Sequence, residues 1–220
     1  LSCKIGLANE EVVNGKCERC GGDTQKRDKE QWMIAITKYA DRLLEDLDKV
    51  DYLEKIKTQQ RHWIGKSEGA EIDFPIPLLF KEGLGVVSVF TTRPDTIFGA
   101  TFLVVSPEVA QKWIDVGWQA SDSVREYVAT SLKREEMDRT AEGKEKTGVD
   151  TGVVAINPAN GKEIPVWVAD YVLGGYGTGS IMSVPFHDER DRAFAEAFGL
   201  PIVDEPLVVF DEAVAKVGGR

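Results

Sequence analysis

The sequence predicts a mixed α/β protein with a barrel-like β core and surrounding helices, preceded by a small cysteine-containing module and a helical segment. Apolar residues recur at helical spacing in the first third of the chain, several short β-branched runs follow, and glycine or proline separates most of these segments. We place the boundary after residue 64. Residues 1–64 then form a linker with the module and the helical segment, and 65–220 form the main domain.

Composition limits the class of protein before any motif is considered. The 220 residues are 42% hydrophobic and 29% charged, which is typical of a globular protein and not of a disordered chain. Apolar runs such as Ile76–Phe80 are far shorter than the roughly 20 residues of a membrane-spanning helix, so we expect no membrane partner. The net charge of −10, from 27 basic and 37 acidic side chains, argues against broad non-specific nucleic-acid binding but leaves room for a local basic site.

The start of the chain and its cysteine count predict an internal piece of a longer cytoplasmic protein. Leu1 is followed almost at once by Cys3 and Lys4, with neither an initiator Met nor the regions of a signal peptide. The sequence holds 3 cysteines. An odd count without a secretory segment favours a reducing compartment.

A helical segment, either one long helix or a broken one, is expected from Glu30 to Trp63. Its apolar residues at helical spacing are Trp32, Ile36, Tyr39, Leu43, Leu47, Val50, Leu53 and Ile56. The pattern changes at Gly65–Gly69, and after it Ala70, Ile72 and Phe74 alternate with acidic residues, as in a strand.

The rest of the chain predicts short strands interspersed with helices. Ser106-Pro107-Glu108 is an N-cap signature for a helix reaching Val116. Gly152–Ile156 and Glu163–Ala169 should form a hairpin, because the Asn160-Gly161 pair between them suits the positive φ angles of its turn. The other expected elements are strands at Val86–Thr92, Thr101–Val105 and Ser180–Val184, helices at Asp122–Met137 and from His187–Asp191 through Phe198, and a weak strand and short helix within Val203–Arg220.

Cys17 and Cys20 form a C-x2-C pair followed by two glycines, the arrangement of a zinc knuckle. Cys3 offers a third thiolate. A structural zinc takes four ligands, and the 2 histidines, His62 and His187, are distant in sequence. The pattern leaves open both an occupied structural zinc site and a degenerate module without metal.

A second candidate segment is Thr91–Gly99, at the end of a strand-like run that Pro94 interrupts. Its hydroxyls and the guanidinium of Arg93 suit a phosphate, a ribose or a carbonyl oxygen. In the alternative, Asp95 and Thr96 only satisfy the backbone of a turn.

Asp188 and Asp191 lie three residues apart at a helix start, and therefore on one face. We expect Asp191 at an exposed first-turn position, where acidic residues are also ordinary capping. A binding role is favoured by Gly174–Gly179, a glycine-rich route that lets backbone approach a ligand closely. His187 could act as a base, but no Ser or Cys nucleophile is near it, and a nucleophile elbow, an H-E-x-x-H site and a phosphate loop are absent from the sequence.

Together these segments closely resemble the editing domain of leucyl-tRNA synthetases, the connective-polypeptide insertion. Thr91–Phe102 is similar to its threonine-rich motif, and Gly177–Asp191 with Phe198–Leu200 to its second active-site motif. The segments that resemble the stretch leading into this insertion in bacterial-type enzymes are Leu7–Gly15, Cys17–Cys20, Gln31-Trp32, Ile36–Ala40 and Trp63–Gly69. Valyl and isoleucyl enzymes carry similar domains, but valyl enzymes usually have lysine in place of Met182 and Asn in place of Arg190, which favours the leucyl family.

The resemblance implies hydrolysis of the ester that joins a wrong amino acid, such as norvaline or isoleucine, to the terminal adenosine of leucine tRNA. Asp188 and Asp191 would then meet the amino group, and Arg93 would meet backbone phosphate near the 3′ end. The remaining residues that the resemblance places at the site are Thr91 and Thr92 at the ester and adenosine, Thr96 against the amino-acid side chain, and Tyr176, Met182, Val184 and His187 around the base, ribose and side chain.

The resemblance further implies attack by a positioned water, without a cofactor for editing. The partners would be the 3′ end of leucine tRNA and the remainder of a leucyl-tRNA synthetase. The signatures of the ATP-dependent aminoacylation site are absent from the sequence, so no aminoacylation is expected of this chain. Two alternatives remain, an editing domain of a valyl or isoleucyl enzyme and a non-catalytic tRNA-docking or metal module.

Overall fold

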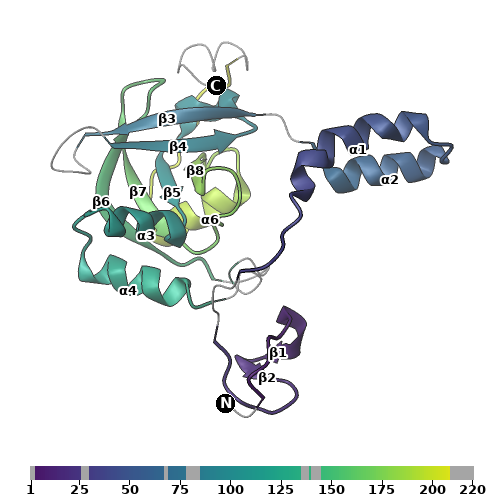
Figure 1. Cartoon of the computed structure of the whole chain (residues 1–220). Coiled ribbons are helices and arrows are strands. Elements are labelled where there is room, and N and C mark those ends of the chain that lie inside the picture. The colour runs from purple at the N-terminus through teal and green to yellow at the C-terminus, as the bar shows by residue number, and fades with distance from the viewer. Residues whose placement is uncertain are drawn as a thin grey trace. The chain divides into compact units, whose positions relative to one another are not determined.

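The computed structural model describes residues 3–25, 30–66, 69–77, 85–134, 139 and 145–208 (Figure 1). The chain divides into two compact units, Leu1–Lys66 and Ser67–Arg220, and each is described by itself. Within the described ranges, no helix combines the length and the apolar character needed to cross a membrane.

The cysteine module of the first unit is a small hairpin. A 3-10 helix η1 (Asn9–Glu11) precedes the two-residue antiparallel strands β1 (Val12–Val13) and β2 (Lys16–Cys17). Asn14 and Gly15 join the strands with φ angles of 51° and 74°. Because a two-residue hairpin turn of this type needs positive φ at both positions, an Asn-Gly pair is the sequence that forms it most readily.

The helical segment is broken, which is one of the two forms that the sequence predicted. It consists of the 3-10 helix η2 (Ile36–Tyr39), α1 (Ala40–Asp46), the 3-10 helix η3 (Leu47–Lys49) and α2 (Glu54–Ile64), and residues 30–35 form no helix. Helices α1 and α2 pack against each other. Of the apolar stripe only Leu47 is buried, while Trp32 and Trp63 are almost fully exposed.

The second unit contains two sheets. Strands β3 (Ala70–Ile76) and β4 (Gly85–Thr91) pair antiparallel in one of them. The other has the order β6-β7-β5-β8, with β5 parallel to β7 and antiparallel to β8. Its strands are β5 (Phe102–Val105), β6 (Gly148–Ile156), β7 (Glu163–Ala169) and β8 (Ser180–Ser183).

The mixed α/β class is confirmed, but the barrel-like core is not a closed barrel among the described strands. Strand β4 packs beside β8 and β3 beside β6, yet these neighbours share no hydrogen-bonded ladder. A reason lies in β8, which has 4 residues and ends at Ser183, two residues before Pro185. So short an edge, followed by a residue without an N–H, offers few groups for a further ladder.

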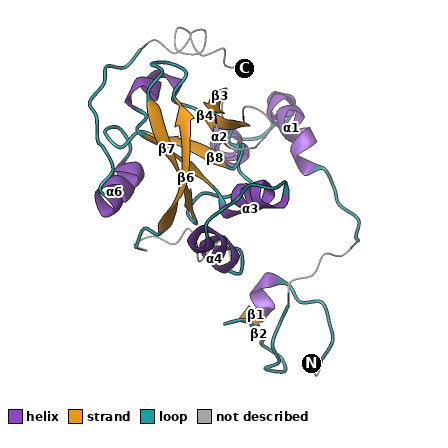
Figure 2. Ribbon diagram, turned by 90° about the vertical axis from the view of Figure 1, so that its left-hand side faces the viewer, coloured by secondary structure: helices purple, strands orange, loops and turns teal. Residues whose placement is uncertain are grey.

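Helix α6 lies on one side of the four-stranded sheet and α3 and α4 on the other (Figure 2), and buried apolar residues pack on both faces. Leu103 and Val105 of β5 belong to a core that includes residues of α3 (Pro107–Asp115) and α4 (Asp122–Ser131). Phe102 and Val104 point to the opposite side and pack with Phe194 of α6 (Glu189–Phe198). Burying a side chain of the size of Phe194 stabilises the fold by about 1.5–3 kcal/mol.

Several predicted boundaries move. Helix α4 ends at Ser131, and the predicted end at Met137 lies outside the described residues. The hairpin of β6 and β7 is confirmed, but of the Asn160-Gly161 pair only Gly161 has positive φ, at 69°. The connection is a longer loop, in which the Asn157 N–H donates to Lys162 O at 2.9 Å. Residues 203–208 form neither a helix nor a strand, and the remainder of the predicted tail elements lies outside the described part of the chain.

Candidate functional site

The fold brings the threonine-rich segment and the second candidate motif side by side. Thr91 ends β4, and the next residues lead into the 3-10 helix η4 (Pro94–Gly99). A Cβ built on Gly99 would lie 3.3 Å from Val184 Cγ1. The pKa of Asp95, lowered mainly by its hydrogen bond with Arg93, is lowered slightly further by the charge of His187. Residues about ninety positions apart in sequence thus form one surface at the β4 and β8 edges.

The hydroxyls of the threonine-rich segment are partly used by the segment itself. Thr91 Oγ1 accepts a hydrogen bond from the Arg93 N–H at 3.0 Å. Thr96 is only 4% exposed, and its hydroxyl donates to Arg93 O at 2.8 Å. The turn-closing role considered for Thr96 therefore exists, whatever else its methyl group contacts. Thr92, by contrast, is exposed.

Arg93 is held by a neighbouring carboxylate. Its Nε donates to Asp95 Oδ1 at 2.9 Å and its Nη2 to Oδ2 at 2.8 Å. This bidentate pair is the main cause that lowers the pKa of Asp95. The guanidinium remains 59% exposed, so it can still meet an anion, but part of its charge is already balanced.

Asp188 is the N-cap of α6. Its Oδ1 accepts from the backbone N–H groups of Arg190 at 2.8 Å and Asp191 at 3.1 Å, as the capping alternative predicts. The Arg190 guanidinium lies 3.5 Å from Asp188 Oδ2, and the Asp188 side chain is 38% exposed. Asp188 thus combines a structural bond with access to solvent.

The predicted exposed position of Asp191 is wrong. Asp191 is 6% exposed, and its Oδ2 accepts a hydrogen bond from the Val184 N–H at 2.8 Å. The chain after β8 turns back over the first turn of α6 and covers this carboxylate. Burial raises the pKa of Asp191 to about 6, with a smaller contribution from the charge of Asp188. A first-turn acid that would be solvated on an isolated helix is here enclosed by tertiary structure.

Two neighbours of Asp191, half-buried Tyr171 and buried Ser183, were not singled out from the sequence. The pKa of Tyr171 is raised by burial and by the charge of Asp191, and Ser183 contributes to lowering the pKa of both groups. A tyrosine after β7 and a serine at the end of β8 form no recognisable motif. Tyr171 packs on Phe194 of α6 with ring centroids 5.7 Å apart, so tertiary packing, not sequence proximity, brings it to this region.

The four predicted pocket residues differ in exposure. Met182 and Val184 are buried in the main core. Tyr176 is 70% exposed, and exposed His187 packs the edge of its ring on Phe186 with centroids 5.1 Å apart. The structure therefore offers two rigid apolar positions and two accessible rings.

The glycines of Gly174–Gly179 serve the protein's own packing. A Cβ on Gly174 would lie 2.7 Å from Glu108 Cβ, one on Gly179 2.9 Å from Val109 Cγ2, and one on Gly177 3.2 Å from Phe90 Cβ. Gly177 and Gly179 also have positive φ, at 56° and 71°. At these three positions the missing side chain admits helix α3 and strand β4, and the close approach of a ligand to this segment stays a prediction.

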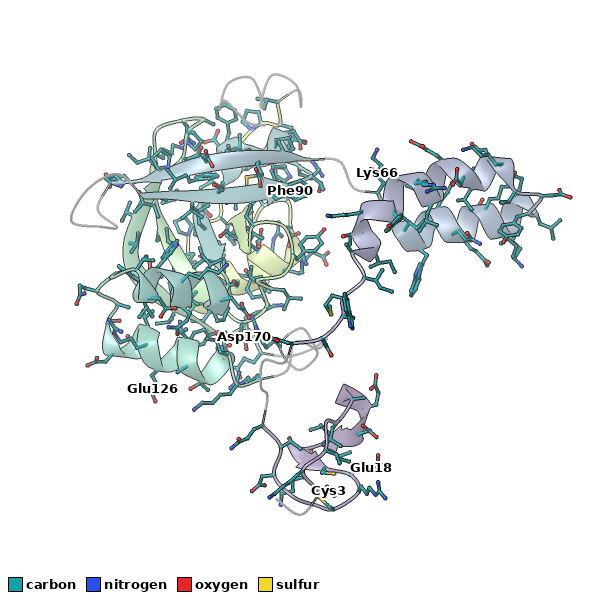
Figure 3. All side chains as sticks on the ribbon, viewed as in Figure 1. Cys3, Glu18, Lys66, Phe90, Glu126 and Asp170 are labelled. Carbon is teal, nitrogen blue, oxygen red and sulfur yellow. The ribbon has the colours of Figure 1, made fainter. Side chains whose placement is uncertain are left out.

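The three cysteines converge in the first unit, with Cys3 near the turn that carries Glu18 (Figure 3). The Sγ atoms of Cys3, Cys17 and Cys20 all lie within 4.8 Å of one another. Sulfur atoms around a tetrahedral zinc are about 3.7 Å apart, as Zn–S distances of about 2.3 Å require. Proximity to the Cys20 thiol raises the pKa of Cys3. Three soft ligands in one place fit zinc, which would supply structural cross-linking and no chemistry to the other unit.

Comparison with known proteins gives one consistent result. Residues 61–213 match a family model described as "Leucyl-tRNA synthetase, editing domain". The chain is 52% identical over 205 residues to a leucine–tRNA ligase of Alkaliphilus oremlandii, and 52% identical over 216 residues to one of Elusimicrobium minutum. These alignments cover 92% and 98% of the chain but 25% of either relative, so the chain spans about a quarter of their length.

A solved structure agrees. The chain is similar, with a TM-score of 0.68 and 36% identity, to the crystal structure of LeuRS from Agrobacterium radiobacter K84 in a ternary complex with tRNA and LeuAMS. The match covers 93% of this chain and 24% of that one.

Proposed function

Because the chain belongs to the family of leucyl-tRNA synthetase editing domains, we propose that it hydrolyses the ester between a wrong amino acid and the terminal adenosine of leucine tRNA. The observation that carries the proposal is the juxtaposition of the Thr91–Gly99 segment with the carboxylates of Asp188 and Asp191. Norvaline and isoleucine are the substrates we propose, because they differ from leucine by a methylene or by the branching position.

The two carboxylates bind the amino group of the substrate in this proposal. A helix N-terminus alone repels an ammonium group, and two acids in the first turn reverse the local sign. Asp188 is accessible for this contact. Asp191, fixed by its bond to the Val184 N–H, supplies the second charge from a position that does not move. A buried carboxylate interacts more strongly with a desolvated cation than an exposed one does.

The reaction we propose is attack by a positioned water on an already activated ester. We place the ester beside the turn from β4 into η4. Exposed Thr92 and the hydroxyl of Thr91 are the polar groups that this turn offers to it. Positioning supplies most of the rate in such a mechanism. A second hydrolytic site is useful because one methylene is worth only about 1–3 kcal/mol of discrimination in an apolar synthetic pocket.

The test is a deacylation assay with leucine tRNA charged by norvaline, isoleucine or leucine. We expect hydrolysis of the first two esters and not of leucyl-tRNA. Preference for threonyl or valyl esters on the tRNAs of valine and isoleucine would instead assign the chain to the valyl or isoleucyl alternative. Binding of tRNA with every ester left intact would establish a docking module and refute the hydrolytic proposal.

Arg93→Ala should weaken tRNA binding and flatten its salt dependence. The exposed guanidinium is proposed to meet one backbone phosphate, and one such contact changes the slope of log K against log salt by roughly one unit. Asp95→Asn is the matched control, because it removes the carboxylate that balances Arg93 and should strengthen binding. The measurement is the affinity for tRNA at several salt concentrations. Equal slopes for Arg93→Ala and the parent would contradict the proposed phosphate contact.

We propose that Cys3, Cys17 and Cys20 hold a structural zinc together with a fourth ligand that the sequence does not identify. The protein purified with zinc should carry one equivalent of metal. Cys17→Ser should lower that content and the thermal stability of the first unit, because a buried thiolate ligand is lost. Metal analysis of the two proteins is the measurement, and equal metal content would favour the degenerate module.

We also propose that the first unit contacts the remainder of the ligase. The chain spans about a quarter of its relatives' length, and the first unit leaves large apolar side chains exposed between residues 32 and 63. They include Trp32, Met33, Ile34, Ile36, Leu53 and Trp63. A contiguous exposed apolar patch marks an interaction surface, and we propose that these side chains form one against the remainder of the ligase.

A further inference from the structure

Among the described residues of the second unit, Arg139 is the most deeply buried cation, only 3% exposed, and the proposed site does not use it. Its Nη1 lies 2.6 Å from Glu108 Oε1, and its Nη2 lies 3.3 Å from Oε2. The same guanidinium donates to two backbone carbonyl oxygens, Asp170 O through Nε at 2.8 Å and Val172 O through Nη2 at 2.9 Å. A charge is buried this completely only when it is paired and hydrogen-bonded.

These contacts hold the start of the glycine-rich loop, defined here as residues 173–179. Val172 immediately precedes the loop. Glu108, the partner of Arg139, lies directly over Gly174, because a Cβ there would meet its Cβ, Cγ and Oε2 within 2.9 Å. Arg139 and Glu108 therefore clamp the chain between Asp170 (Figure 3) and Gly174 against the N-terminus of α3.

The other end of the loop is fixed to the same helix. The Ser106 N–H donates to Gly179 O at 2.9 Å, and a Cβ on Gly179 would lie 3.2 Å from Gly174 Cα. The two ends of the loop thus meet at α3. Between them, Gly177 approaches Phe90, the residue before Thr91, and Tyr176 projects with 70% exposure. The clamp at one end of the loop and the candidate site at its tip are joined by one short, tightly packed segment.

We infer that Arg139, with Glu108, is a positioning residue that sets the loop and Tyr176 against the threonine-rich segment. The inference rests on the proposed function, because in that function the ring of Tyr176 binds the terminal base of the tRNA by stacking. Loss of the clamp would then leave the reacting groups in place and misplace the base-binding ring. The Michaelis constant should change, and the rate constant of the bound ester should not.

The test compares deacylation of norvalyl-tRNA by the 220-residue chain and by its variants. Arg139→Met should raise KM by about tenfold, the effect of weakening one base–aromatic stacking contact, with kcat within about twofold. Arg139→Lys should be intermediate, because an ammonium group cannot serve two carbonyls and a bidentate carboxylate together. Arg134→Met is the matched control. In the described part of the chain the Arg134 side chain reaches the Asp170 carboxylate, at 3.2 Å, rather than a backbone carbonyl of the loop, so the KM of this variant should be unchanged.

A double-mutant cycle separates positioning from general destabilisation. With Tyr176→Ala as the background, Arg139→Met should have little further effect on KM, because the ring that it positions is gone. If Arg139→Met does not fold, Glu108→Gln takes its place, since it keeps the packing over Gly174 and removes the partner charge. Additive effects in the cycle, or an unchanged KM in a folded clamp variant, would overturn the inference.

Amide hydrogen exchange tests the clamp without the reaction. Exchange at residues 173–179 should be faster in Arg139→Met or Glu108→Gln than in the parent, while the amides of β5 keep their protection. Unchanged exchange in the loop would also overturn the inference. If the parent protein fails to hydrolyse any mischarged tRNA, the proposed function is refuted, and the exchange result still decides whether the clamp exists.

Discussion

Asp191→Ala should abolish deacylation and also lower the stability of the fold. The substitution removes the acceptor of the Val184 N–H, a bond of 2.8 Å in a region where Asp191 is 6% exposed. A buried donor left without a partner costs about 1–3 kcal/mol. Thermal unfolding should show this loss, so inactivity of this variant alone would not prove a role in binding.

Asp191→Asn separates the two roles. The amide oxygen can still accept from the Val184 N–H, but the charge that would meet an ammonium group is gone. We expect a folded protein whose deacylation rate falls by at least about a hundredfold, the effect of losing one strong charged contact in a dry site. Hydrolysis of isoleucyl-tRNA at the parent's rate by folded Asp191→Asn would rule out the amino-anchor role.

The pH dependence of folding stability gives a second comparison of the parent protein with Asp191→Asn. Burial raises the folded-state pKa of Asp191 to about 6, above its unfolded value of about 3.9. The folded state therefore binds the proton more tightly, so this contribution to stability is full below pH 4 and is lost as the pH rises through 6. The loss amounts to about 2–3 kcal/mol.

Asp191→Asn carries no such titration. Its stability relative to the parent should therefore rise between pH 4 and pH 7, and at pH 8 it should be at least as stable as the parent. Deacylation by the parent, which needs the ionised carboxylate, should increase over the same range. Denaturant unfolding of both proteins at pH 4, 6 and 8 is the measurement, and parallel stability curves would contradict the burial of an ionisable group.

Thr96→Ala should let the domain hydrolyse correctly charged leucyl-tRNA while it continues to act on norvalyl-tRNA. The β-branched side chain is stiff. We propose that its methyl group collides with the γ-branched side chain of leucine and so excludes it, whereas the linear side chain of norvaline fits without a collision. Removing the bulk should admit leucine, and side-by-side deacylation of the two esters measures it.

Two further variants separate the methyl group from the hydroxyl. Thr96→Val keeps the bulk but loses the hydrogen bond to Arg93 O, whereas Thr96→Ser keeps that bond and loses the methyl group. A steric gate predicts that Thr96→Ser gains leucyl hydrolysis and Thr96→Val does not. If Thr96 only closes its turn, Thr96→Val and Thr96→Ala lower hydrolysis of every ester alike and Thr96→Ser behaves as the parent.

Local signals in the sequence were sufficient for the elements that form the site. Ser106 caps α3 with its hydroxyl accepting from the Val109 N–H, and Asp188 caps α6, which ends at Gly199 in the left-handed conformation. Both were predicted because capping depends on a few adjacent residues. The motifs at Thr91–Gly99 and Gly177–Asp191 were likewise sufficient to indicate the family that the comparison with known proteins establishes.

Tertiary structure alone decided the environment of these same residues. Asp191 has the sequence position of a solvated first-turn acid, and it is buried because the turn after β8 lies over it. The glycines at 174 and 179 were interpreted as space for a ligand, and the structure shows that they admit α3. Arg139 lies in a charged stretch that gives no hint of its burial. Capping and turn preferences act within a few residues, whereas desolvation depends on which distant segment covers a group, and no local pattern records that.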